Sequence, residues 1–417
     1  MLKQLSQLLK SKEIKKLLEN FFSLSVLKLL NAILPFVTLP YLIKVLGFQQ
    51  YGAIVLGLSL IAYFQAITDY GFNLSATREI VQHRQSKKQI SYIYSKTIVS
   101  KVYLLALSLI VLMVLIFSVP QFKEDSSVYL LMCLMLVGQT LLPEWFFRGI
   151  EKMKYITIMD ATTKIIFTVG IFLMVKKPED YWVYPMLYGL SFLAVASISN
   201  YMVIKTYKIN FSFIGLKRVN KNLYKGFPLF VNQFMPNFYN NTTTFLVGII
   251  LGKSVAGFFG AIRQVVNILS VFNAVVSTVV FPYLLRKKEK FQLFSKIYTL
   301  AFLGLVLAII TIHSLILQWI GVHGKHSSLI FVLLLIGVFF VAMYSLYSTN
   351  YLIPRGYDKV VMKNTFIISI LGLITSYPLI SLLGVVGGAL NIAMAQLLMG
   401  ITAYMYYLKF KQVEKEI

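Results

Sequence analysis

The sequence has few charged residues for its length. Lys, Arg, Asp and Glu make up 13% of the 417 residues, whereas hydrophobic residues make up 58%. Soluble globular chains carry roughly 25% charged residues, so the composition argues against a water-soluble fold. The mean hydropathy of +0.75 and the 26 Tyr and 32 Phe are typical of a membrane protein with aromatic belts at the lipid headgroups.

The sequence also lacks the usual signs of catalysis. Its single cysteine, Cys133, lies in an apolar run and cannot form an internal disulfide. The four histidines show no metal-ligand spacing with cysteines or carboxylates, and no Walker motif is present. We therefore expect a protein that is not an enzyme and that holds no metal or organic cofactor.

Apolar stretches long enough to cross a bilayer recur along the whole chain. A membrane helix needs about twenty mostly apolar residues. Candidates run over residues 22–43, 51–72, 97–119, 128–147, 155–175, 181–203, 227–250, 256–283, 293–318, 327–351, 361–382 and 385–408. The sequence thus predicts an all-α integral membrane protein with about twelve membrane helices.

Basic residues indicate the orientation of these helices. The chain has 40 Lys and Arg against 15 Asp and Glu, and the basic residues lie between the apolar stretches rather than on one face. This distribution indicates that the basic residues determine the membrane topology, and it argues against a nucleic-acid partner. The predicted outer loops contain only Lys44, Lys123, Lys176, Lys177, Lys253 and Lys325, so both termini are predicted to be cytoplasmic.

Two short motifs occur once in each half of the chain. Leu46, Gly47 and Gly52 correspond to Leu251, Gly252 and Gly257, and Arg148 and Gly149 correspond to Arg355 and Gly356. Because six crossings is an even number, both halves begin on the same face and form parallel repeats, as in many transporters.

This repeat divides the chain into predicted domains. We expect an amphipathic cytoplasmic helix (1–21), an N-lobe (22–203), a cytoplasmic linker (204–226), a C-lobe (227–408) and a cytoplasmic tail (409–417).

Ionisable residues within the predicted spans are candidates for function, because charge is costly in hydrocarbon. Arg263 lies deep in the eighth span and is able to bind a phosphate; the alternative is a structural ion pair. Lys28 and Asp69 lie at similar depth in the first two spans. They form either a structural pair, or an anion-attracting lysine and a site for H⁺ or Na⁺; a further alternative is that Lys28 extends its ammonium group to the membrane surface.

Two pairs show helical spacing that favours internal salt bridges. Glu144 precedes Arg148 by four residues, and Asp160 and Lys164 have the same spacing. Glu144 is a second candidate for ion coupling. Arg148 and its counterpart Arg355 are candidates for a cytoplasmic gate or for structural contacts.

The seventh span begins with unusual polarity. It contains the carboxamides Asn232, Gln233, Asn237, Asn240 and Asn241, followed by threonines. Lipid does not solvate such groups, so they are predicted either to bind a carbohydrate substrate or to join helices to one another.

Several of these stretches together resemble a known family. They are Leu39-Pro40-Tyr41-Leu42 with Leu46-Gly47 and Tyr51-Gly52; Asp69-Tyr70-Gly71-Phe72 with Arg78-Glu79; and Trp145-Phe146-Phe147-Arg148-Gly149. In these the chain resembles the Wzx O-antigen flippases, polysaccharide transporters of the MOP (MATE-like) exporter superfamily.

The resemblance implies two six-helix lobes around a cationic cavity that opens alternately to each face. It implies transport of an undecaprenyl-pyrophosphate-linked oligosaccharide across the bacterial inner membrane, for use by a glycan polymerase with its chain-length regulator. It places Lys28 and Arg263 at positions facing the cavity. The alternatives are a multidrug or cation exporter of the same superfamily and a membrane glycan polymerase or ligase.

Overall fold

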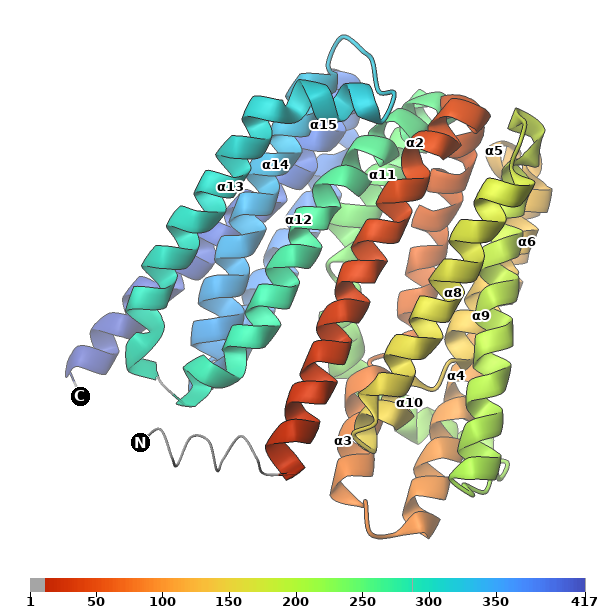
Figure 1. Ribbon diagram of the computed structural model, residues 1–417, viewed down its shortest axis with the longest axis vertical. Helices are drawn as coiled ribbons and strands as arrows, with labels where there is room; N and C mark the ends of the chain where they lie inside the picture. Colours follow the sequence, from red (N-terminus) through yellow and green to blue (C-terminus); the bar gives the residue numbers. More distant parts are fainter. Residues whose placement is uncertain (1–11, 287, 417) are drawn as a thin grey trace.

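The computed structural model describes residues 12–286 and 288–416, in which all regular secondary structure is helical (Figure 1). The helices of the first half are α2 (Lys12–Asp69), α3 (Phe72–Gln82), α4 (Lys87–Ser118), α5 (Pro120–Lys123), α6 (Ser126–Leu141), α7 (Glu144–Gly149), α8 (Met153–Met174), η1 (Pro178–Trp182), α9 (Val183–Tyr201) and η2 (Met202–Thr206). Helices satisfy their own backbone hydrogen bonds, which is the requirement that a bilayer imposes.

The second half repeats this helical pattern. Its elements are α10 (Leu216–Phe234), α11 (Asn237–Leu251), α12 (Lys253–Arg286), η3 (Lys288–Lys290), α13 (Phe291–Trp319), α14 (Ser327–Tyr344), η4 (Ser345–Leu352), η5 (Ile353–Arg355) and α15 (Asp358–Glu416).

Glycines turn the chain back on itself between long helical arms. Within α2, Gly47 has φ 69° and ψ 172°, and Gly252, between α11 and α12, has φ 93° and ψ 165°. Positive φ values of this kind suit glycine, which has no Cβ. The two copies of the Leu-Gly motif therefore form the same turn, as the repeat predicts. Within α15, Gly384 also has a positive φ, of 58°, and separates two helical arms.

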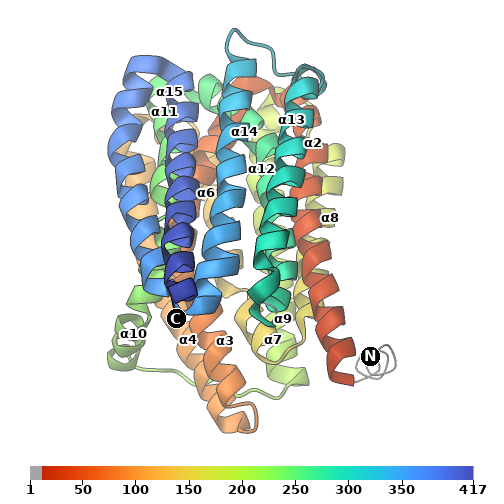
Figure 2. The same ribbon diagram turned by 90° about the vertical axis from the view of Figure 1, so that its left-hand side faces the viewer.

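The helices form two groups that diverge from one end of the molecule. Figure 1 shows α12 to α15 on one side and α2 to α9 on the other. We call the end with the Gly47 and Gly252 turns the hairpin end. The start of α2 and the end of α15 both lie at the opposite end, which Figure 2 also shows.

Nine helical segments in the described residues are long and apolar enough to cross a membrane. Two of them, Phe36–Gln82 and Asp358–Gln412, include the turns at Gly47 and Gly384. The all-helical membrane fold is thus confirmed, while the count of about twelve crossings stays a prediction.

Helix α10 packs against the first half of the chain, although the lobe boundary was expected near residue 227. Asn222 Nδ2 donates to Ser100 Oγ at 3.1 Å, and the ring of Phe230 stacks on Tyr70 with centroids 4.6 Å apart. Val219 is fully buried in a cluster with Val99. The chain between the two halves is therefore held by α2, α3 and α4.

The predicted amphipathic helix of residues 1–21 lies partly outside the described residues, and its last part continues into α2.

Candidate functional site

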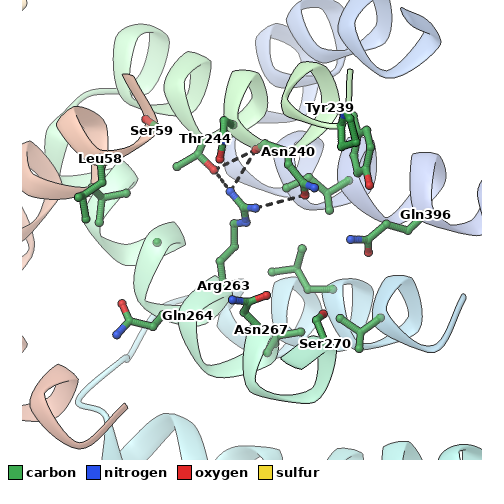
Figure 3. A pocket seen from close by; sticks show the side chains of 18 of the residues that line it. Leu58, Ser59, Tyr239, Asn240, Thr244, Arg263, Gln264, Asn267, Ser270 and Gln396 are labelled. Carbon is green, nitrogen blue, oxygen red and sulfur yellow. Dashed lines mark hydrogen bonds between the residues drawn. The ribbon is translucent and has the colours of Figure 1, made fainter. Parts of the chain in front are cut away.

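Arg263 lies on α12, facing the polar start of α11 (Figure 3). Its Nη1 donates to the backbone oxygen of Asn240 at 3.1 Å and to the hydroxyl of Thr244. Its Nη2 donates to Asn240 Oδ1 at 3.3 Å. The sequence places these partners on one face of α11, because residues four apart in a helix share a face.

All of these contacts are with neutral groups. No carboxylate forms an ion pair with Arg263 in the part of the chain that the structure describes. A guanidinium has five donors in a fixed planar arrangement, suited to binding a phosphate or carboxylate with two hydrogen bonds. The arginine is therefore positioned by its neighbours, and its charge is left uncompensated.

Arg263 lines a cavity of about 610 Å³. Its other described polar lining residues are uncharged: Tyr51, Ser59, Asn237, Tyr239, Asn240, Asn241, Thr244, Gln264, Asn267, Ser270 and Gln396. Three of the predicted carboxamides, Asn237, Asn240 and Asn241, thus lie around the predicted arginine. Carboxamides and hydroxyls both donate and accept hydrogen bonds, so this lining is suited to the hydroxyl groups of a sugar.

Both halves of the chain contribute to this cavity. Tyr51 and Ser59 lie on the second arm of α2, and the Tyr51 hydroxyl donates to Gln264 Oε1 on α12 at 2.8 Å. Tyr63, further along the same arm, donates to the backbone oxygen of Asn237 on α11 at 3.2 Å. Relative movement of the two halves must therefore break or rearrange contacts at the cavity wall.

Of the other predicted substrate-binding residues, the structure places only Gln233. Gln233 is an exposed residue of α10 and does not line the cavity. The side chains of Lys28 and Asn232 lie outside the described residues.

A second, smaller cavity of about 150 Å³ lies within the first half. Three carboxylates line it, Asp69, Glu144 and Asp160, together with Lys101. Lys101 Nζ is 3.0 Å from Asp69 Oδ1, and its side chain is only 2% exposed. The two carboxylates predicted for ion coupling are therefore brought together.

The structure also identifies their partners. Asp69 pairs with Lys101, which sequence reasoning missed because Lys101 lies near the start of a strongly apolar run. Glu144 Oε2 lies 2.8 Å from Arg148 Nη2, so the predicted pair is formed. Lys164 donates to the Tyr188 hydroxyl. No group of three His, Cys, Asp or Glu side chains suited to a metal ion occurs among the described residues.

The two copies of the Arg-Gly motif differ in detail. Arg355 lies over the ring of Tyr351, 3.7 Å from its centroid, whereas Arg148 pairs with Glu144. The residue with positive φ is Gly356 in the second copy, where it follows Arg355 directly, but Glu151 in the first, two residues after Gly149. These arginines therefore make local contacts of different kinds.

At the hairpin end the two halves are joined closely. Lys253, which begins α12, lies 2.6 Å from Glu124 Oε2 and 2.5 Å from Asp125 Oδ2, both between α5 and α6. Gly52 and Gly257, from the two repeats, face each other so closely that added Cβ atoms would meet the backbone of the opposite half. This end of the molecule is closed.

Comparisons with known proteins agree with this architecture. A family described as "Polysaccharide biosynthesis protein" matches residues 17–288. A "Putative O-antigen transporter" of Escherichia coli (strain K12) is 25% identical over 382 residues, which cover 89% of this chain and 92% of that protein. One with the same name from Shigella dysenteriae is also 25% identical, over 88% of this chain and 94% of that protein.

Two solved structures show the fold. An inward-facing multidrug resistance transporter of the MATE family, in the MOP superfamily, has a TM-score of 0.70 and 13% identity, covering 91% of this chain and 95% of that one. The lipid II flippase MurJ, in an inward closed conformation, has a TM-score of 0.68 and 16% identity, covering 95% and 87%. The predicted MATE-like fold is thereby confirmed.

Proposed function

Because this chain belongs to the family of polysaccharide biosynthesis proteins, we propose that it is a flippase for a lipid-linked oligosaccharide. Its relatives named as O-antigen transporters support this proposal. So does the fold that it shares with a lipid II flippase. The observation that carries the proposal is the uncompensated guanidinium of Arg263 in a cavity of neutral polar groups between the two halves.

The proposed substrate is an oligosaccharide joined to undecaprenyl pyrophosphate. Its phosphates carry negative charge, and moving such charge through hydrocarbon is very costly unless it is paired. Arg263 supplies one cation, while the Asn240 and Thr244 oxygens hold its guanidinium in place. The polyprenyl chain needs no polar path, since it remains soluble in lipid throughout the transfer.

The remaining cavity lining suits the saccharide. Asn237, Asn241 and Asn267 offer both donors and acceptors, and the side chain of Tyr239 adds an aromatic surface. Lys28 stays a candidate second cation for the pyrophosphate and Asn232 a candidate for the sugar, whereas Gln233 does not line the cavity.

We propose that the closed hairpin end faces the periplasm, because the predicted outer loops contain few basic residues. The inner leaflet is then the side from which substrate enters in this conformation. Transfer requires separating Gly52 from Gly257 and Lys253 from its two carboxylates, while the opposite ends of the lobes close. The predicted lobes, 22–203 and 227–408, move as the two halves, except that α10, which contains the first residues of the second lobe, is held by the first.

A proton or Na⁺ is the proposed source of energy. Asp69 and Glu144 line one small cavity with Asp160 and Lys101, and each predicted carboxylate already has a cationic partner. Protonation of Asp69 releases Lys101, which alters the packing of α4 against α2. Protonation of Glu144 releases Arg148 within α7, which packs against α3 and α8. Arg148 and Arg355 are proposed as residues near the cytoplasmic gate. We propose no metal or organic cofactor.

Delivery to the periplasmic leaflet places the product before an enzyme that extends the glycan. A glycan polymerase and its chain-length regulator are therefore proposed partners, as are the lipids of the bacterial inner membrane.

The experiment is transport in vesicles that contain only this protein. We expect a fluorescent undecaprenyl-pyrophosphate-linked oligosaccharide to cross the bilayer, as measured by quenching from outside. A cationic drug is not expected to cross, since the cavity lining in the described residues includes an arginine and no carboxylate. Drug transport without lipid movement would support a multidrug exporter, and chain extension by this protein would support a polymerase or ligase.

A further inference from the structure

Gln396 is a buried polar residue in an apolar part of the cavity wall. It lies on the second arm of α15 and is 8% exposed. The neighbouring lining residues on α14 and α15 are Leu334, Val338, Val341 and Ile392. A carboxamide in this wall is costly to bury unless it is hydrogen-bonded, and its sequence context gave no sign of a role.

The carboxamide of Gln396 has no hydrogen-bond partner among the described residues. Its Oε1 is buried and unpaired. Figure 3 shows its amide nitrogen directed toward the cavity, on the side where Asn240 and Arg263 lie. The unpaired oxygen lies against α14, whereas the amide nitrogen faces the cavity and is available to donate to a ligand there.

Gly337 on α14 fixes the direction of this side chain. A Cβ added to Gly337 would lie 2.2 Å from Gln396 Oε1 and 3.2 Å from the Cα of Ala393. Only a glycine leaves room for the oxygen at this place. With the oxygen packed against α14, the two N–H donors of the carboxamide are presented to the cavity.

We propose that Gln396 determines specificity by donating a hydrogen bond from Nε2 to an oxygen of the saccharide. The phosphates bind Arg263, and the sugar contacts the carboxamides of α11 and Gln396 on the neighbouring wall formed by α15. This inference rests on the proposed function, which it extends by naming a residue that recognises the sugar rather than the phosphate.

Replacement of Gln396 by methionine tests this role, because methionine has a similar length and no donor. The matched control is Asn364→Leu, since Asn364 is another buried carboxamide of α15 with an unpaired nitrogen, and it does not line the cavity. Removing an unpaired buried polar group is neutral or stabilising. We therefore expect neither variant to lower the thermal unfolding temperature of the purified protein.

Two lipid probes separate the sugar from the phosphate. They are undecaprenyl pyrophosphate alone and the same lipid carrying the oligosaccharide of the producing strain. We expect Gln396→Met to weaken binding of the glycosylated lipid about tenfold and to leave binding of the bare lipid unchanged. Asn364→Leu is expected to bind both lipids as the wild type does.

Gly337→Ala provides a test of positioning. The added methyl group displaces the Gln396 carboxamide, so affinity for the glycosylated lipid is expected to fall. In a Gln396→Ala background the same change is expected to cost little more, because the group that it displaces is absent.

The outcomes distinguish the inference from the proposed function. If Gln396→Met binds both lipids as tightly as the wild type, the inference is wrong and the proposed function stands. If the wild type binds neither lipid, the proposed function is wrong, and the inference fails with it.

Discussion

Gly52 and Gly257 occupy the same position in the two halves of the chain and pack against each other. A Cβ on Gly52 would lie 1.7 Å from the backbone oxygen of Lys253, and one on Gly257 would lie 2.2 Å from that of Phe48. The repeated motif therefore does more than turn a hairpin in each half. It forms the surface on which the halves meet.

Gly52→Ala is predicted to disturb this contact. Inserting a methyl group into a packed interface typically costs about 1–3 kcal/mol, and here the neighbour is rigid backbone. We expect a lower thermal unfolding temperature and a hairpin end that is more open, measured by labelling a cysteine introduced nearby. Gly304→Ala is the control, since a Cβ there meets nothing within 4 Å.

Lys253→Ala is predicted to loosen the same end by a different route. It removes both ion pairs across the halves and leaves Asp125, which is 7% exposed, without its cation. We expect longer distances between spin labels on α6 and α12. Lys325→Ala, which removes an exposed lysine of another loop at this end, is expected to leave them unchanged.

The contact between Glu124 and Lys253 also predicts a pH dependence. The hydrogen bond and charge of Lys253 lower the pKa of Glu124. A carboxylate whose pKa is lowered by a contact stabilises that contact at pH values above its ordinary pKa of about 4.3 and loses this effect as the pH falls through the lowered pKa. The spin-label distance is therefore expected to stay constant between neutral pH and about pH 5. A change of the spin-label distance between neutral pH and about pH 5 would show that protonation of Glu124 does not control the contact at the hairpin end.

Asp69→Asn is predicted to destabilise the protein strongly, because it leaves the buried ammonium of Lys101 unpaired. Breaking a buried ion pair from one side typically costs about 3–5 kcal/mol. Glu79→Gln, which breaks the more exposed pair with Lys96, is expected to cost about 1 kcal/mol or less.

The double variant Asp69→Asn/Lys101→Met separates stability from coupling. It removes both charges, so the unfolding temperature is expected to recover. If Asp69 carries the coupling proton, the dependence of transport on a pH gradient is lost nevertheless. A double variant that keeps this dependence would assign the pair a structural role alone.

Arg263 variants are predicted to differ according to charge and geometry. In a strain whose surface glycan depends on this gene, Arg263→Ala is expected to abolish glycan display. Arg263→Lys is expected to retain part of it, because the charge survives while the planar arrangement of donors is lost. Protein levels, measured by immunoblot, must match those of the wild type.

Much of the fold was predictable because membrane helices carry a strong local signal. The length of the apolar stretches predicted where the helices lie, and the Leu-Gly repeat predicted the turns at Gly47 and Gly252. Arg263 was found for a related reason: an isolated charge in a long apolar segment stands out against its surroundings.

The missed features depend on contacts between distant segments. Lys101 resembles a lysine that ends a membrane helix, and only the packing of α4 against α2 shows it buried beside Asp69. Gln396 is unremarkable in an apolar sequence until α14 places Gly337 against it. The docking of α10 on the first half follows from contacts such as that of Asn222 with Ser100, which no local pattern encodes.

The most direct test of the account is the rate at which Arg263→Ala moves a labelled undecaprenyl-pyrophosphate-linked oligosaccharide in vesicles. Wild-type and variant proteins are reconstituted at equal density. Loss of a charged partner for a phosphate is worth about 1.5–3 kcal/mol, so we predict a rate lower by roughly 10-fold to 100-fold. Equal rates for the two proteins would contradict the assignment of Arg263 as the anchor for the phosphates.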